Sequence, residues 1–359
     1  MVVTLGNGKL KKLSKHTKKY NSNSCKRGHA FSVAIIGCGN FGALNDLNSN
    51  NKNTALTHLK AYQLLKGFNV VGCVDKDSEK LRRIRCYNAE IKMFNSYGAM
   101  FKEIIPDIVS IVTPDETHEK ILYDLAKYPI KLVFCEKPLS LSYRSVLAIN
   151  RLYKKKKIAI QVNYSRRFIK EFGQLKEKID NNKFGKTRKI VIHYNGGLYH
   201  NGSHFIDLLF YLFGEPWKIR AVNSIKSNNK NDYTISGIIS YKNSYSFDVV
   251  MVGHDTYSRP FSEVEFFFDE GQVRLRMGGS IMEYYKFEKE KYLGGYEELS
   301  LIKTIKTEYP HRKIINAIKN IKDYLILGIP LKSPADNSLK VIKLCENLSI
   351  QAKLGRKYA

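Results

Sequence analysis

Over residues 31–138, apolar runs of strand length alternate with amphipathic stretches of helical period. The four clearest strand patterns end at Ile36, Asp75, Val112 and Pro138. Apolar residues between these runs recur with the spacing of a helix that has one buried face. This alternation predicts a right-handed, doubly wound parallel sheet of the Rossmann type. Ligands of such sheets bind at the carboxyl ends of the strands, so the residues that follow each run are candidate site residues.

The pattern changes after about Ser140. A helical stretch leads to the strand 158–168, and a second helical stretch ends at a turn around Gly185. Longer alternating runs then predict a large, mostly antiparallel open sheet. These runs cover residues 186–196, 217–226, 232–243, 244–254, 262–277 and 280–289, and helices are expected at 311–328 and 337–355. We therefore predict an α/β fold with a nucleotide-binding domain over residues 31–150 and an α+β domain over residues 151–359.

The net charge of +27 narrows the function classes only slightly. Such a charge is compatible with a nucleic-acid-binding surface, but the lysines are dispersed and no nucleic-acid-binding motif is present. Residues 1–30 hold eight Lys and Arg residues and no acid, which predicts a disordered basic tail. No apolar run reaches the length of a membrane span, and no signal peptide is apparent. We expect a cytoplasmic protein that binds neither membrane nor nucleic acid.

A glycine-rich turn follows the first strand as Gly37, Gly39 and Gly42 in the spacing G-x-G-x-x-G. The first glycine permits a tight turn, and the second lets the backbone approach a pyrophosphate. The third lets the following helix pack closely against the strand, with its N-terminus facing the phosphates. The turn predicts a dinucleotide cofactor because it lies between a strand and an expected helix.

Asp75 ends the second strand, where an acid can accept hydrogen bonds from a ribose diol. This position favours NAD over NADP. The spacing from Gly42 is longer than usual because a polar insertion, residues 45–54, interrupts the crossover. Lys76 keeps NADP open, since a neighbouring cation can accept a 2′-phosphate.

Two histidines, His200 and His204, lie four residues apart in the stretch GGLYHNGSHFIDLLFYLFGEP. A metal site is disfavoured because Gly202 interrupts the shared helix face and no glutamate follows His200. The alternatives are a general base at His204, with Asp207 one turn later to orient its ring, or a core histidine. We expect no bound metal.

With these motifs in view, the chain resembles the glucose-fructose oxidoreductase / inositol dehydrogenase / MocA family from Phe31 to the C-terminus. The resemblance rests on IIGCGNFG, VSIVTPDETH, CEKPLS, VNYSRRF, HNGSHFIDLLFYLFGEP and LKSPADNSLKVIKLCENL. It implies a Rossmann domain followed by an α/β domain whose open sheet often forms oligomer contacts. It also implies hydride transfer between NAD(P) and a hydroxyl of a sugar, nucleotide-sugar or cyclitol.

The resemblance assigns roles to individual residues. Lys137 falls on the family's catalytic lysine, and His204 falls on its catalytic histidine. Lys137 precedes a proline whose peptide bond is often cis in the family. His200 replaces the family's usual aspartate, so it has a pocket role, shares the proton relay, or alters the chemistry. Cofactor contacts are expected from Gly37, Gly39, Asn40, Phe41, Gly42, Asp75, Thr113, Pro114, His118, Glu136 and Lys137. Substrate contacts are expected from Asn163, Arg166, Arg167, Tyr199, His200 and Asp207, with either arginine able to bind a carboxylate or phosphate.

Three other functions stay open at this point. A lyase or glycosidase of the same fold would use bound NAD as a transient hydride store. A cofactor-binding partner protein without turnover would not need Lys137 and His204, which are retained. Nucleic-acid binding rests on charge alone. The most favoured prediction is an NAD(P)-dependent oxidoreductase that forms a homo-dimer or tetramer through its C-terminal sheet.

Overall fold

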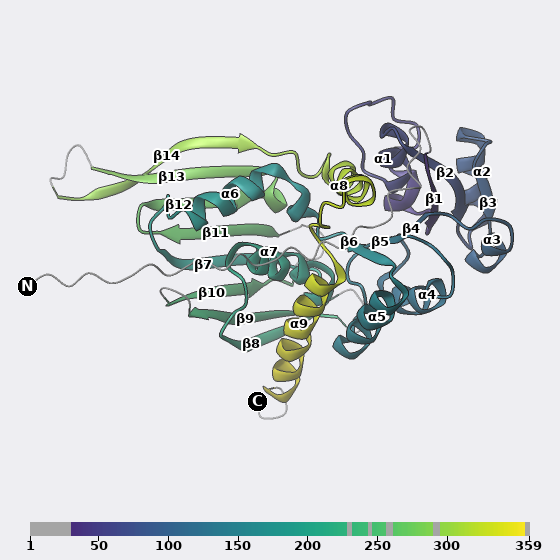
Figure 1. Ribbon diagram of the computed structural model, residues 1–359. Helices are drawn as coiled ribbons and strands as arrows, with labels where there is room; N and C mark the ends of the chain where they lie inside the picture. The colour runs from purple at the N-terminus through teal and green to yellow at the C-terminus, as the bar shows by residue number, and fades with distance from the viewer. Residues whose placement is uncertain (1–29, 228–231, 243–245, 256–260, 290–294, 356–359) are drawn as a thin grey trace, which may run out of the picture.

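The structure is a computed structural model that describes residues 30–227, 232–242, 246–255, 261–289 and 295–355. The predicted basic tail lies outside the described residues, apart from Ala30. Two sheets stand side by side and form the two halves of the molecule (Figure 1). Within the described ranges, no helix combines the length and apolar character needed to cross a membrane.

The first sheet is parallel throughout and has the strand order β3-β2-β1-β4-β5-β6. Its central strands β4 and β5 are apolar and buried along their whole length, which is typical of a sheet covered on both faces. This order places the switch point between β1 and β4, where doubly wound sheets bind their ligands. The strands are β1 (Phe31–Ile36), β2 (Phe68–Val74), β3 (Lys92–Phe94), β4 (Ile108–Ile111), β5 (Leu132–Cys135) and β6 (Ala159–Val162).

Helices flank this sheet in the predicted alternation. They are α1 (His58–Leu64), α2 (Ser78–Tyr87), α3 (Tyr97–Glu103), α4 (His118–Leu125) and α5 (Tyr143–Lys156). The sixth strand lies past residue 150, where we placed the domain boundary, so the parallel sheet itself extends to Val162. The late helix α8 (Lys313–Leu327) also packs on this half, against α1 and the turn Ser165–Phe168.

The second sheet has eight strands in the order β14-β13-β12-β11-β7-β10-β9-β8. All of its pairs are antiparallel except β7 with β10. Helices α6 (Lys170–Asp180), α7 (Ser203–Phe213) and α9 (Ala335–Gly355) lie on one face of this sheet (Figure 1). Its strands are β7 (Thr187–Tyr194), β8 (Lys218–Lys226), β9 (Tyr233–Lys242), β10 (Ser246–Gly253), β11 (Ser262–Phe268), β12 (Gly271–Arg276), β13 (Ile281–Lys289) and β14 (Glu297–Lys306).

Two features of this sheet differ from the sequence prediction. The run 262–277 forms two strands, because the chain reverses at Asp269 and Glu270 and pairs β11 with β12. Strand β14 was not predicted at all. It is an edge strand in which the consecutive residues Leu301 and Ile302 are both more than half exposed, so the alternation that signals a half-buried strand is absent.

Candidate active site

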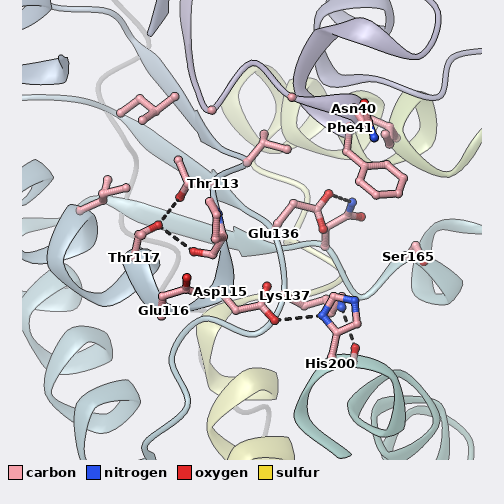
Figure 2. A pocket seen from close by; sticks show the side chains of 18 of the residues that line it. Asn40, Phe41, Thr113, Asp115, Glu116, Thr117, Glu136, Lys137, Ser165 and His200 are labelled. Atoms are coloured by element: carbon pink, nitrogen blue, oxygen red, sulfur yellow. Dashed lines mark hydrogen bonds and ion pairs between the residues drawn. The ribbon is translucent and has the colours of Figure 1, made fainter. Parts of the chain in front are cut away.

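A cavity of about 1090 Å³ opens where the carboxyl edge of the parallel sheet meets the second half of the chain. Figure 2 shows side chains from both halves pointing into this space. The cavity brings together most of the sequence-predicted site residues. They are Gly37, Gly39, Asn40, Phe41, Asp75, Thr113, Pro114, Glu136, Lys137, Asn163, Arg166, His200 and His204.

The glycine turn has the geometry that each glycine was expected to provide. Gly37 has a positive φ of 95°, and a Cβ there would lie 2.5 Å from the carbonyl oxygen of Val112. A Cβ at Gly42 would overlap the carbonyl oxygen of Gly37. A Cβ at Gly39, in contrast, would meet no atom within 4 Å, because this residue faces the cavity. The free space above Gly39 fits a pyrophosphate that approaches the backbone.

The helix that follows the glycine turn is interrupted by the polar insertion. Only the turn Asn40–Leu44 is helical before the polar insertion, and α1 begins at His58. A single turn has a weak dipole, so the expected stabilisation of the phosphates by a helix N-terminus is not supported. Backbone access at Gly39 remains the main feature that fits a pyrophosphate.

Asp75 lies beside the glycine turn at the end of β2. Its carboxylate accepts hydrogen bonds from the backbone N–H groups of Cys38 at 2.8 Å and Asp77 at 3.0 Å. These bonds fix the carboxylate at the cavity wall, with lone pairs left for a ribose diol. Lys76 and Lys80 also line the cavity, and the Nζ of Lys80 lies 3.8 Å from the Asp75 carboxylate.

Lys137 is also buried in the cavity wall, after β5. Its ammonium group donates a hydrogen bond of 2.6 Å to the carbonyl oxygen of His200, and the Lys137-Pro138 peptide bond is cis (Figure 2). Burial lowers the pKa of Lys137 below its ordinary value of 10.5, although the carboxylates of Asp115 and Glu136 act in the opposite direction. The side chain is thus a desolvated cation inside the cavity.

Glu136 is held by two partners from distant parts of the chain. The Nε2 of His58 lies 3.1 Å from its carboxylate, and the Nδ2 of Asn163 donates a bond of 2.7 Å to the same oxygen. Burial alone raises the pKa of Glu136, but these two bonds and the charges of His58 and Lys313 lower it overall to about 2. Glu136 is therefore an anion that fixes the loop carrying Lys137.

His118 does not line the cavity, although we expected a cofactor contact there. Its ring is fully buried behind the wall, with Nδ1 2.8 Å from the carbonyl oxygen of Pro138 and Nε2 2.9 Å from that of Thr113. It ties the loop after β4 to the loop after β5. Any effect of His118 on a cofactor acts through the position of these loops.

His204 lies in the first turn of α7 and lines the cavity. Burial lowers its pKa well below the ordinary value of 6.5, and the positive charges of Lys137, Arg166 and Lys313 lower it further. Its ring is therefore neutral at neutral pH. A neutral imidazole beside a cationic lysine has the protonation state that a general base requires.

His200 pairs with Asp115, an acid that sequence reasoning did not select. The Nδ1 of His200 lies 3.0 Å from the Asp115 carboxylate, which belongs to the other half of the molecule (Figure 2). Burial raises the pKa of Asp115, but the bond to His200 and the charge of Lys137 lower it overall. Gly202 has helical backbone angles, so our argument that it interrupts the helix before α7 is wrong.

No three His, Cys, Asp or Glu side chains gather in a metal-binding arrangement within the described part of the chain. His200 is joined to Asp115 instead.

Arg166 and Arg167 have different environments. Arg167 forms an ion pair of 2.8 Å with Asp207 and stacks over Tyr211. Because Asp207 is engaged there, its carboxylate is not free to orient His204 in the way we expected. Arg167 and Asp207 do not line the cavity, whereas Arg166 does.

Gly42 and Tyr199 also lie away from the cavity wall. Gly42 packs on the glycine turn, while the backbone N–H of Tyr199 donates to the Asp232 carboxylate. Sequence reasoning missed several residues that line the cavity. They include Asp115, Ser165, Asn195, Tyr309 and Lys313. Only Asp115 had an available signal, since it follows the strand end at Thr113-Pro114.

Residues 31–164 match the model of an oxidoreductase family described as having an NAD-binding Rossmann fold. Myo-inositol 2-dehydrogenase of Thermotoga maritima is 23% identical over 197 residues, which cover 51% of this chain and 55% of that protein. Inositol 2-dehydrogenase of Salmonella paratyphi B is 28% identical over 144 residues, or 37% of this chain and 43% of that protein. The chain thus spans about half of the length of these curated relatives.

Solved structures resemble the fold over a longer range. The WlbA dehydrogenase from Bordetella pertussis, solved in complex with NADH and UDP-GlcNAcA, superposes with a TM-score of 0.69 at 15% identity. The match covers 91% of this chain and 98% of that one. The predicted two-part α/β fold is therefore confirmed. Residues 31–164 thus match the NAD-binding Rossmann-fold model of the glucose-fructose oxidoreductase / inositol dehydrogenase / MocA family of oxidoreductases, the family that the motifs predicted.

Proposed function

We propose that the protein is an NAD-dependent oxidoreductase that transfers a hydride between nicotinamide and a hydroxyl-bearing carbon of a sugar, nucleotide-sugar or cyclitol. One observation carries this proposal. The cavity that Gly39 and Asp75 line also contains a buried lysine cation and a buried neutral histidine, Lys137 and His204. Two inositol dehydrogenases among the relatives and a sugar-nucleotide complex among the similar folds favour this substrate class.

The residues fit an alcohol oxidation in which a proton and a hydride leave the same group. The bound nicotinamide would accept the hydride. Lys137 would donate a hydrogen bond to the reacting oxygen and stabilise its alkoxide character, because the ammonium is desolvated. His204 would take the hydroxyl proton, since its ring is neutral. The Lys137 bond to the His200 carbonyl would be exchanged for one to the substrate oxygen.

The pH dependence of turnover should follow these two groups. His204 acts as a base only above its pKa, which is lowered below 6.5, so the acid limb should lie below pH 6.5. Lys137 stabilises an alkoxide only while protonated, and its pKa is lowered below 10.5, so activity should fall again before that pH. A kcat/KM profile in the direction of alcohol oxidation measures both limbs. An acid limb above pH 6.5 would contradict the assignment of His204.

Two single variants should each shift one limb of the kcat/KM profile. The His200→Asp change replaces a neighbour that lowers the pKa of His204 with an anion, so the acid limb should move to higher pH. The Asp115→Asn change removes a charge that raises the pKa of Lys137, so the alkaline limb should move to lower pH. If neither limb of the pH profile moves, His200 does not affect the pKa of His204 and Asp115 does not affect the pKa of Lys137. Loss of activity on chelation, restored by zinc, would instead indicate a metal at His200.

Cofactor choice should favour NADH. The Asp75 carboxylate would accept bonds from a ribose diol and repel a 2′-phosphate, so NADH should bind about tenfold or more tightly than NADPH. The Asp75→Asn variant loses the charge and keeps an oxygen acceptor for only one of the Cys38 and Asp77 N–H groups, and it should narrow the difference between the two affinities. Fluorescence titration with NADH and with NADPH measures the two affinities. Tighter NADPH binding by the wild-type protein would mean that Lys76 and Lys80 dominate.

The main alternative is a lyase or glycosidase that returns the hydride to its substrate within each turnover. A screen of sugars, sugar acids, nucleotide-sugars and cyclitols with NAD, read at the nicotinamide absorbance, distinguishes the two. A dehydrogenase accumulates NADH in proportion to substrate consumed. Substrate loss without NADH would support the alternative, and nucleotide binding without turnover of any compound would support a cofactor-binding partner.

We also propose a cytoplasmic homo-oligomer that assembles through the second sheet. Its face opposite α6, α7 and α9 carries a row of partly exposed apolar side chains on adjacent strands. Val250 pairs with Val191 on one side and with Ile238 on the other. Burying such a row against a second copy is favourable. Analytical ultracentrifugation of the full chain should show a dimer or tetramer, and a monomer at all concentrations would reject this proposal.

A further inference from the structure

Arg166 is a buried cation that no described acid neutralises. Its side chain is 4% exposed, and its Nε and Nη2 groups donate to the carbonyl oxygen of Gly278 at 3.2 and 2.8 Å. Its guanidinium lies 4.7 Å from the centre of the Phe205 ring. The remaining amino group, Nη1, is buried and has no hydrogen-bond partner among the described residues. Burying a charged group without a partner is costly, so this arrangement points to a missing anion.

The adjacent arginine provides an internal comparison. Arg167 is also largely buried, but its charge is compensated by Asp207 and it lies off the cavity. Arg166 borders the cavity, and no carboxylate of the described residues lies within 4.0 Å of it. Burial lowers the pKa of Arg166, and the charges of Tyr309 and Asp207 offset this effect only in part. The two side chains therefore have different roles, one in the core and one at the site.

A second cation lies near Arg166. Lys313 begins α8, lines the cavity, and likewise has no described carboxylate within 4.0 Å. The Nζ of Lys313 and the guanidinium of Arg166 lie 5.3 and 5.5 Å from the centre of the Tyr309 ring. Burial raises the pKa of Tyr309, but these two cations, Ser165 and Lys137 lower it overall. The positive end of the α8 dipole adds to the field at this position.

The acids at this end of the cavity are already engaged. Glu136 is bound by His58 and Asn163, and Asp115 is paired with His200. Lys137, Arg166 and Lys313 therefore leave an excess of positive charge around the expected reacting centre. The pyrophosphate of a dinucleotide does not account for Arg166. Lys313 lies 5.8 Å from the ring of Phe41 in the glycine turn, whereas no contact links Arg166 to that turn among the described residues.

We propose that the substrate is an acid whose carboxylate binds at Arg166, with Lys313 and the α8 N-terminus adding to the attraction. The substrate class is then a sugar acid or a related hydroxy acid, in which the carboxylate lies within a few bonds of the hydroxyl that reacts at Lys137 and His204. This inference rests on the proposed oxidoreductase function. Arg166 acts here as a specificity-determining residue, because the hydroxyl groups of a neutral sugar would leave its buried positive charge uncompensated.

Calorimetric titration of the NADH-saturated full chain tests the inference. The probes are D-glucuronate with D-glucose, D-galacturonate with D-galactose, and D-glucose 6-phosphate. The acid in at least one pair should bind about 10- to 100-fold more tightly than its neutral counterpart, the range expected for one hydrogen bond between charged groups. The Arg166→Gln variant should lose that advantage while keeping its NADH affinity.

Two further variants keep the test decisive. Lys313→Gln leaves the bonds between Arg166 and Gly278 in place, so it can test the same anion site even if Arg166→Gln folds poorly. It should lower the ratio of acid to neutral-sugar affinity severalfold. The Lys120→Gln control removes another cavity-lining cation, one that is already paired with Asp124, and should leave the advantage intact. Equal affinities within both pairs, or a preference for the phosphate over both acids, would overturn the inference. Failure to bind NADH would instead overturn the proposed function.

Discussion

Replacing Gly39 with valine is expected to abolish NADH binding and to leave the fold intact. A Cβ at this position would meet no heavy atom within 4 Å and would face the cavity, so the apo protein has room for the valine side chain. That same room is where a pyrophosphate would approach the backbone, and two branched methyl groups would fill it. We expect an affinity loss of at least about 100-fold, equivalent to about 2.7 kcal/mol, with a Tm within a few degrees of wild type. Calorimetry and thermal unfolding measure the two quantities.

The third glycine of the turn supplies the matched comparison. A Cβ at Gly42 would overlap the carbonyl oxygen of Gly37, so Gly42→Val should destabilise the domain itself. We therefore predict that Gly39→Val lowers NADH affinity, whereas Gly42→Val, three residues later, lowers the stability of the fold. Wild-type NADH affinity in Gly39→Val would reject the pyrophosphate site at this turn. Equal destabilisation by the two variants would show that Gly39 has a structural role.

Removing either Lys137 or His204 is expected to lower turnover by about two orders of magnitude or more, the usual scale for a positioned acid–base group. Both side chains line the cavity, and the lowered pKa of His204 keeps its ring neutral, as a general base requires. NADH affinity should change little in Lys137→Ala and His204→Ala, because neither residue lies at the glycine turn. Steady-state kinetics on the substrate found by the screen, with nucleotide titration alongside, measures both effects.

A lysine-to-alanine control addresses loss of charge alone. Lys131 is exposed and pairs with Asp107 away from the cavity, so Lys131→Ala should have near wild-type turnover. Near-normal turnover in both active-site variants would remove the catalytic assignment. A large loss in only one of them would leave that residue as the single acid–base group.

Local sequence patterns predicted the half of the molecule that is built from successive strand and helix units. The glycine turn, Asp75 and Lys137 each follow a buried strand, and parallel strands bring their carboxyl ends to one edge whatever the intervening loops contain. For this reason, residues separated by a hundred positions could be placed together from the strand pattern alone. Thr113 and Pro114 could be placed at the cavity in the same way, because they follow a buried strand.

The sequence could not predict contacts that depend on how the two halves meet. His200 pairs with Asp115 across the cavity, and Lys313 and Tyr309 reach it from a segment far along the chain. No periodicity encodes such pairs, because they arise from the packing of separate elements. Arg166 and Arg167 show the limit most clearly. They are chemically identical neighbours, and only the tertiary structure reveals that Asp207 neutralises one of them.

A crystal structure of the full chain with bound NADH tests the account most directly. We expect the pyrophosphate over Gly39, the adenosine ribose at Asp75, and the nicotinamide ring beside Lys137 and His204. This placement would put the hydride, the lysine cation and the neutral histidine around one substrate position. A nucleotide bound in the reverse direction, or a nicotinamide ring remote from Lys137 and His204, would contradict it.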